Sequence, residues 1–212
     1  MKNFNMRWAT RSVRPAAVAG LALAALGVSA CGSATAREGT ASSYLVINVL
    51  EAQRVTEQGS GSGLFTTVLR SDVLTKGTVF EDNGRVVMTA AMRDVTNPNG
   101  PSTNNRITVN RYRVEFRRSD GRDRPGVDVP YAFDGAATFT VGPGDEATIP
   151  FSLVRAQAKL EAPLMALRGL GGSVLISTIA DVTFYGRDQA GRDTSVTGQI
   201  SVNFADWGDP ED

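Results

Sequence analysis

The sequence contains no histidine and only one cysteine, Cys31, among its 212 residues. Histidine is the usual general base at neutral pH and, together with cysteine, the usual zinc ligand. A single cysteine near the N-terminus leaves the rest of the chain without a thiol nucleophile and without a disulfide. We therefore expect a folded part that has no Cys/His zinc site and that is stabilised by its own hydrophobic core.

Lysine is also scarce, which limits serine chemistry. Without histidine a nucleophilic serine would need a lysine base, and beyond residue 30 the chain has only Lys76 and Lys159. Neither completes a Ser-x-x-Lys motif, and residues 59–63 (GSGSG) have glycine where Gly-x-Ser-x-Gly has its serine. We interpret residues 59–63 as a flexible loop. The sequence predicts no catalytic residue, no cofactor and no metal site, and hence a protein that is not an enzyme.

Charge is balanced over the whole chain but unevenly distributed. The chain has 22 basic and 22 acidic residues, and the first 30 residues hold four of the basic ones and none of the acidic ones (Lys2, Arg7, Arg11, Arg14). The remainder therefore carries 18 basic and 22 acidic side chains, a formal charge of −4. Proteins that bind phosphate backbones usually carry a basic surface. We therefore expect no nucleic-acid partner.

The basic N-terminal segment is followed by an apolar stretch over residues 16–28 (AAVAGLALAALGV). Its 13 residues are too few to span about 30 Å of hydrocarbon as a helix, but they are typical of the apolar region of a signal peptide. The next residues complete the motif Val28-Ser29-Ala30-Cys31, in which one aliphatic and two small residues precede a cysteine.

This motif resembles the lipobox of bacterial lipoproteins. The resemblance implies that residues 1–30 are a signal peptide, removed before Cys31, and that the Cys31 sulfur carries diacylglycerol as a membrane anchor. Two or more acyl chains make such an anchor stable. Gly32 follows the cysteine where family members retained in the inner membrane have aspartate, which implies the outer membrane or the cell surface. The alternative is an ordinary secretory leader cut after Ala30.

Beyond Cys31 we expect three regions. Residues 31–43 are the lipidated cysteine and a flexible tether of small, polar residues. Residues 44–207 form one folded domain, and residues 208–212 form an acidic tail.

Apolar and polar residues alternate in the domain, which is typical of half-buried β-strands. The clearest alternating sets are Ala137, Phe139 and Val141; Ala147, Ile149, Phe151 and Leu153; Val174, Ile176, Ala180, Val182 and Phe184; and Val196, Gly198, Ile200, Val202 and Phe204. The last two sets, joined by residues 187–193, predict an antiparallel hairpin. Residues 44–56, 84–95 and 64–75 predict further strands.

Two segments depart from simple alternation. In residues 106–118 the apolar positions change parity between Val109 and Tyr112, which predicts a β-bulge near Asn110-Arg111. Residues 155–168 contain good helix formers, with leucines at helical spacing (Leu160, Leu164 and Leu167). Pro163 limits this helix to a short connection.

Together these patterns predict an all-β fold, an antiparallel immunoglobulin-like β-sandwich of about seven to eight strands with one short connecting helix. Residues 111–121 resemble a strand and turn of fibronectin type III or immunoglobulin-like domains. The only tryptophans, Trp8 and Trp207, lie outside the predicted strands, so the core tryptophan common in those families is absent. The resemblance therefore concerns architecture.

Several groups of polar residues are candidate ligands. Asp120, Asp123 and Asp128 could supply a carboxylate pair. Calcium could be held by acids of the last hairpin and the tail (Asp181, Asp188, Asp193, Asp206, Asp209, Glu211 and Asp212). The polar loop 97–105 suits recognition, and a basic strand face (Arg111, Arg113, Arg117 and Arg118) could meet acidic headgroups or glycans.

The leading hypothesis is a membrane-anchored envelope lipoprotein whose sandwich is a non-enzymatic binding or structural module, with a protein or glycan partner. One alternative is a hydrolase that uses carboxylates alone, which requires two of the acids to meet in a cleft with raised pKa values. The other is a calcium-stabilised, adhesin-like domain.

Overall fold

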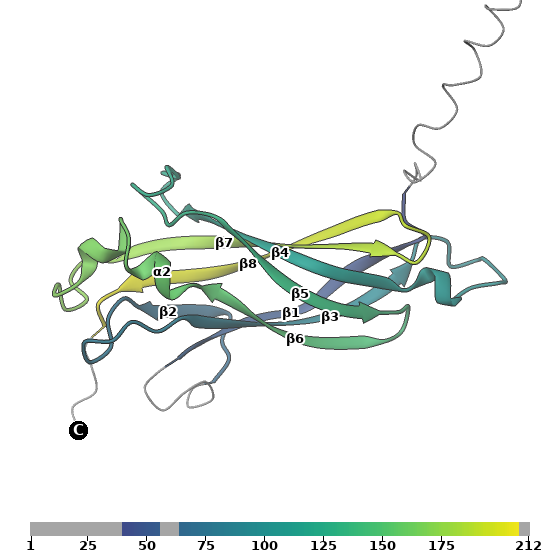
Figure 1. The fold of residues 1–212 in the computed structure, drawn as a ribbon, viewed down its shortest axis with the longest axis horizontal. Coiled ribbons are helices and arrows are strands. Elements are labelled where there is room, and N and C mark those ends of the chain that lie inside the picture. The colour runs from purple at the N-terminus through teal and green to yellow at the C-terminus, as the bar shows by residue number, and fades with distance from the viewer. Residues whose placement is uncertain (1–39, 56–63, 208–212) are drawn as a thin grey trace, which may run out of the picture. The chain divides into compact units, whose positions relative to one another are not determined.

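The computed structural model describes residues 40–55 and 64–207, and these residues form a β-sandwich (Figure 1). One sheet has three strands in the order β1-β3-β6, and the other has five in the order β2-β8-β7-β4-β5. The strands are β1 (Ser43–Arg54), β2 (Val68–Asp72), β3 (Asp82–Met92), β4 (Ile107–Arg118), β5 (Phe133–Val141), β6 (Glu146–Val154), β7 (Ile176–Asp188) and β8 (Asp193–Ala205). The predicted all-β sandwich is confirmed, and the short strand β2 pairs with β8 in parallel.

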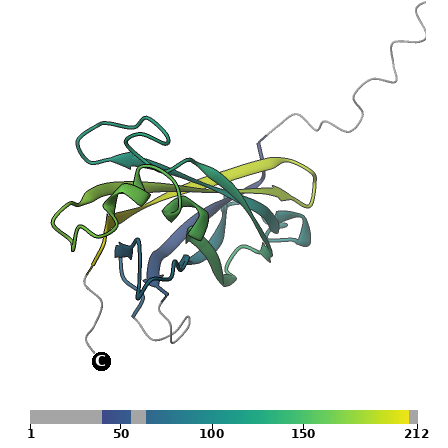
Figure 2. The same ribbon diagram turned by 60° about the vertical axis from the view of Figure 1, so that its left-hand side comes forward.

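The two sheets lie in layers (Figure 2). The core lies between them and is formed by the inward-facing residues of both sheets. Tyr112 from β4 packs against Phe151 from β6 with ring centroids 5.3 Å apart, and Phe151 packs against Phe184 from β7 at 5.5 Å. The Tyr112 hydroxyl donates to the carbonyl oxygen of Ser152 and accepts from its N–H, both at 3.1 Å. This tyrosine therefore joins the sheets by packing and by hydrogen bonds.

The predicted bulge and the predicted C-terminal hairpin are both present. The register of β4 shifts between Val109 and Arg111 against both of its neighbours, so the predicted bulge is confirmed. Strands β7 and β8 form the predicted C-terminal hairpin. The connection 142–145 carries the chain from β5 in one sheet to β6 in the other.

The connection between β6 and β7 contains the short helix α2 (Ala156–Lys159), followed by a 3-10 turn (Leu164–Leu167). Leu164 and Leu167 are buried as their spacing predicts, whereas Leu160 is 46% exposed. Pro163 stands directly before the 3-10 turn. Because proline cannot donate the helical hydrogen bond and crowds the preceding turn, the three leucines do not share one helical face.

The folded domain begins slightly before the predicted boundary at Tyr44. Ala41 and Ser43 are fully buried, and the carbonyl oxygens of Ala41 and Ser42 accept hydrogen bonds from Arg93 at 2.9 and 3.0 Å. The last residues of the predicted tether therefore belong to the sandwich. At the other terminus, Trp207 donates from its backbone to Asp72 (3.0 Å) and from its indole to the carbonyl oxygen of Ser71 (3.2 Å).

The predicted signal peptide, Cys31, the first part of the tether, the GSGSG loop and the acidic tail lie outside the described residues. Among the residues that the structure describes, no helix is long and apolar enough to cross a membrane.

Candidate functional site

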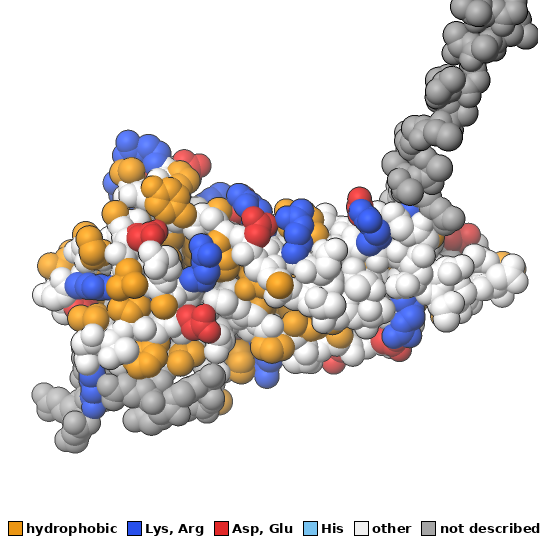
Figure 3. Space-filling view, viewed as in Figure 1, with side chains coloured by type: hydrophobic (Ala, Val, Ile, Leu, Met, Phe, Trp, Pro, Cys, Tyr) orange, Lys and Arg blue, Asp and Glu red, His pale blue; other side chains and the backbone are white. Residues whose placement is uncertain are grey.

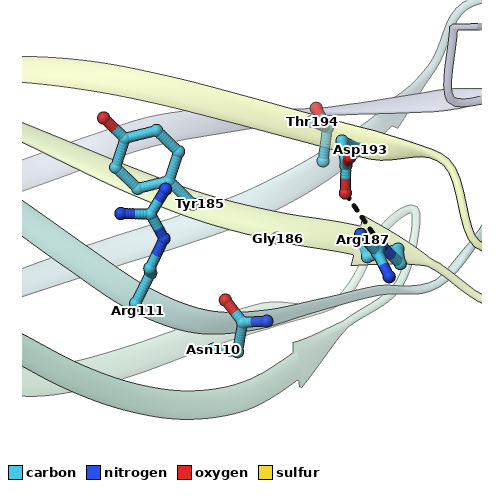
Figure 4. A pocket seen from close by; sticks show the side chains of 7 residues that line it. All are labelled: Asn110, Arg111, Tyr185, Gly186, Arg187, Asp193 and Thr194. Carbon is cyan, nitrogen blue, oxygen red and sulfur yellow. Dashed lines mark hydrogen bonds and ion pairs between the residues drawn. The ribbon is translucent and has the colours of Figure 1, made fainter.

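The bulge in β4 creates a hollow on the outer face of the five-stranded sheet. Asn110 is the extra residue at the register shift, and both Asn110 and Arg111 are exposed on the face that points away from the core. The hollow has a volume of about 300 Å³ and is lined by Asn110, Arg111, Tyr185, Gly186, Arg187, Asp193 and Thr194 (Figure 4). It thus draws on β4, β7 and β8 at once. Bulges commonly re-aim side chains beside functional sites in this way.

Gly186 allows β4 and β7 to approach closely at this point. A Cβ atom on Gly186 would lie 2.8 Å from the carbonyl oxygen of Thr108 and 3.2 Å from the Cα of Val109. Both are backbone atoms, which cannot turn away as a flexible side chain could. The glycine is therefore required where the bulged strand passes its neighbour.

On one side of the hollow Arg111 is held in a defined orientation. Its guanidinium lies 3.9 Å from the centroid of the Tyr185 ring, and its Nη1 donates to Asp134 at 3.1 Å. A guanidinium stacked on an aromatic face is attracted by the ring and keeps its N–H edge free for hydrogen bonds.

On the other side, Arg187 donates from Nε to Asp193 at 2.8 Å, and this hydrogen bond raises the pKa of Arg187 (Figure 4). Both side chains are more than half exposed. Exposed ion pairs of this kind contribute little to stability, so either partner is available to a ligand. The lining therefore combines cationic donors, one carboxylate, an amide and hydroxyl groups, which suits reversible binding of a polar ligand.

The predicted basic face of β4 is largely neutralised. Arg113 pairs with Glu115 and Asp134, each at 2.8 Å. Arg117 pairs with Asp181, and Arg118 with Asp120. Figure 3 shows basic and acidic side chains close together over the visible surface. Of the four predicted arginines, only Arg111 lines the hollow at the bulge.

A carboxyl group that acts as a general acid needs a raised pKa. Two of the predicted acids Asp120, Asp123 and Asp128 have a lowered pKa instead. A hydrogen bond from Arg122 lowers the pKa of Asp120, and one from Arg124 lowers the pKa of Asp128. Asp123 instead lines a second, shallower hollow of about 220 Å³, together with Glu115. Asp120 and Asp128 are therefore each paired with a neighbouring arginine.

The described acids that were candidates for calcium binding each contact other protein groups. Asp181 accepts from Arg117 and Gln199, Asp193 pairs with Arg187, and Asp206 accepts from the backbone of Gly169. Asp188 closes the β7–β8 turn. In the described ranges no group of three or more acidic, histidine or cysteine residues is placed to hold a metal. Asp209, Glu211 and Asp212 lie outside those ranges.

The predicted recognition loop 97–105 ends in a 3-10 turn, Thr103–Asn105. Asn105 is buried, accepts a hydrogen bond from the backbone of Ser102 at 2.8 Å and donates to the Ser42 hydroxyl at 2.9 Å. The base of the loop is thus fixed to the start of the domain. Pro101, Ser102 and Thr103 line a small hollow of about 170 Å³ against the β5–β6 connection.

Sequence reasoning missed a buried polar cluster of Ser71, Asp82 and Lys159. The Lys159 Nζ lies 2.8 Å from Asp82 Oδ2, and the Ser71 hydroxyl donates to the same oxygen at 2.6 Å. Burial raises the pKa of Asp82, and the Lys159 ammonium opposes that rise. All three residues are at most 1% exposed, so the cluster joins β2, β3 and α2 without meeting solvent. No spacing motif marks it, because its members come from three distant segments.

Comparisons with known proteins do not assign this chain to a family. No protein-family model matches it, and no curated protein sequence matches it. Among solved structures, it resembles a Northeast Structural Genomics Consortium target, SoR45, with 9% identity and a TM-score of 0.35, over 79% of this chain and 89% of the other. It also resembles Spo0M, a sporulation control protein from Bacillus subtilis, with 15% identity and a TM-score of 0.29. That match covers 78% of this chain and half of Spo0M.

Proposed function

We propose that this chain is an exported lipoprotein, anchored through Cys31, whose β-sandwich is a non-enzymatic binding module. Its ligand docks on the outer face of the five-stranded sheet, in the hollow at the β4 bulge. The observation that carries this proposal is the construction of that hollow, in which three strands present oriented polar side chains to solvent.

The place where the chain enters the sandwich supports a tethered arrangement. Ser42 donates a backbone hydrogen bond to Asp188 at the β7–β8 turn, close to the residues that line the hollow (Figure 1). Residues 32–40 span at most about 30 Å when extended. An anchor at Cys31 would therefore keep the hollow near the membrane surface, where envelope ligands are concentrated.

The anchor is tested by changing Cys31 to Ser in the full precursor. We expect the unchanged protein to fractionate with membranes and to have an intact mass above that of the polypeptide by a diacylglyceryl group. The Cys31→Ser protein should lose both properties, whereas a Ser33→Ala control should keep them. Equal membrane association of the Cys31→Ser protein, or an unmodified mass of the mature wild-type chain, would contradict the anchor.

The binding role is tested by co-sedimentation of the unlipidated chain with washed envelope fragments from the cells that produce the protein. This chain comprises residues 32–212, so no lipid anchor can sediment it. We expect Arg111→Gln to weaken this association, because Arg111 lines the hollow. Arg117→Gln is the matched control, since Arg117 lies on the same strand face, outside this hollow, and pairs with Asp181 instead. Equal loss in both variants would show that general surface charge, rather than the hollow, is responsible.

A further inference from the structure

We propose that the hollow at the β4 bulge binds a saccharide that carries a carboxylate group. This inference rests on the proposed binding function and specifies its ligand class. It follows from the charges on the two sides of the hollow and from the hydrogen-bonding groups between them.

The two sides of the hollow each present a guanidinium. Arg111 donates a hydrogen bond from Nη1 to Asp134, and Arg187 donates one from Nε to Asp193. Among the described residues, neither Nε nor Nη2 of Arg111 has a hydrogen-bond partner. Guanidinium groups with a free N–H edge bind carboxylates in a bidentate manner. Within the lining two guanidinium groups face one carboxylate, Asp193, while Asp134, the partner of Arg111, lies outside the lining.

Asp193 restricts which anion fits. Its carboxylate would repel a densely charged group such as a phosphate, but it accepts hydrogen bonds from hydroxyl groups. The Asn110 amide provides a further donor and a further acceptor in the same lining. A ligand that combines one carboxylate with several hydroxyls satisfies all of these groups, and a uronic acid has this chemistry.

The size and polarity of the hollow agree with a sugar. A volume of about 300 Å³ lies at the lower end for small-molecule sites. The one aromatic residue of the lining, Tyr185, has Arg111 stacked on its ring. One face of that ring is therefore covered, and the polar side chains of the lining offer hydrogen bonds to a ligand.

The test is a titration of the mature protein in detergent micelles with glucuronate and with glucose, followed by amide NMR shifts of Asn110, Gly186 and Thr194. The two sugars differ mainly in the carboxylate. We expect glucuronate to shift these amides with an affinity at least about tenfold above that for glucose, as one charge-assisted hydrogen bond would give. Arg111→Gln should remove about tenfold of the glucuronate affinity, and the control Arg117→Gln should leave it within about twofold.

The outcomes separate this inference from the proposed function. Equal shifts with glucose and glucuronate at the hollow would overturn the carboxylate preference and leave a sugar-binding module. No shift with either sugar, or shifts only at residues outside the hollow, would overturn the saccharide assignment. If Arg111-dependent association with envelope fragments then persisted, the binding function would stand with a different ligand.

Discussion

The buried pair of Lys159 and Asp82 gives the sharpest test of how the sandwich is held together. Lys159→Met removes the ammonium group and keeps most of the side-chain volume. Asp82, which is fully buried, would then retain the Ser71 hydroxyl but no opposite charge. Breaking a buried ion pair on one side typically costs about 3–5 kcal/mol. That is a large part of the total stability of a domain, which is about 5–15 kcal/mol.

The loss in free energy of unfolding caused by Lys159→Met has an upper limit, because Asp82 can bind a proton instead of remaining charged. An aspartate that ionises with a pKa of 3.8 when unfolded, and stays protonated when folded, costs about 4 kcal/mol at pH 7. Burial already raises the pKa of Asp82, and removing Lys159 removes the main opposing effect. A group with a raised folded pKa contributes its stability below pH 3.8 and loses it as the pH rises. The stability that Lys159→Met loses relative to the unchanged protein should therefore grow by at most about 1.4 kcal/mol per pH unit.

The assay is urea unfolding followed by circular dichroism at pH 4.5 and pH 7. We expect a deficit of about 3–4 kcal/mol at pH 7 and a deficit of about 1 kcal/mol at pH 4.5. The double variant Lys159→Met/Asp82→Asn removes both charges and keeps an acceptor for Ser71, so it should regain most of the loss. A pH-independent deficit, or one below about 1 kcal/mol at pH 7, would refute this reasoning.

Three further perturbations test other parts of the structure. Tyr112→Phe should cost about 1–2 kcal/mol in urea unfolding, because it removes the hydroxyl that bonds to Ser152 across the sheets; an unchanged midpoint would contradict that role. Gly186→Ala should lower the melting temperature and weaken envelope binding together, since its Cβ meets backbone at 2.8 Å; wild-type behaviour in both assays would contradict it. Asp188→Asn should lower the free energy of unfolding at pH 7, but progressively less below pH 4. Burial raises the pKa of Asp188, but the hydrogen bonds from Arg192 outweigh burial, so the pKa in the folded state is lowered. The stabilisation by the Asp188 carboxylate is therefore lost on acidification. An equal loss of melting temperature at pH 3 and pH 7 would count against this.

Local patterns in the sequence predicted much of the fold. The alternation of apolar residues in 176–184 and 196–204 corresponds to the inward face of the β7–β8 hairpin, including the buried Ala180, Val182, Ile200 and Phe204. Val174, which was predicted to share this face, lies before β7 and is 45% exposed. The parity change near Asn110 marked the bulge. Such signals are readable because a strand repeats every two residues, so a single segment shows which face is buried.

Long-range pairing could not be predicted in the same way. The parallel pairing of β2 with β8 joins residues more than 100 positions apart, and the five residues of β2 carry little pattern. From the sequence, Lys159 was noted only as a lysine without a serine motif, and Asp82 was not singled out. Their meeting with Ser71 depends on three separate chain segments reaching one end of the sandwich. For the candidate hollow, the sequence likewise indicated Arg111 but not Tyr185 or Gly186.

The hollow at the bulge follows from the energetics of the core rather than from any special sequence at the surface. Five apolar residues of β4 on opposite parities are all buried (Ile107, Val109, Tyr112, Val114 and Phe116). A strand without a bulge would expose one of these two sets, at about 1.5–3 kcal/mol for each large side chain. Placing one extra residue on the outer face avoids that cost, and it brings Asn110 and Arg111 side by side toward solvent. The core therefore enforces the geometry of the hollow, while the identities of the lining residues remain free to suit a ligand.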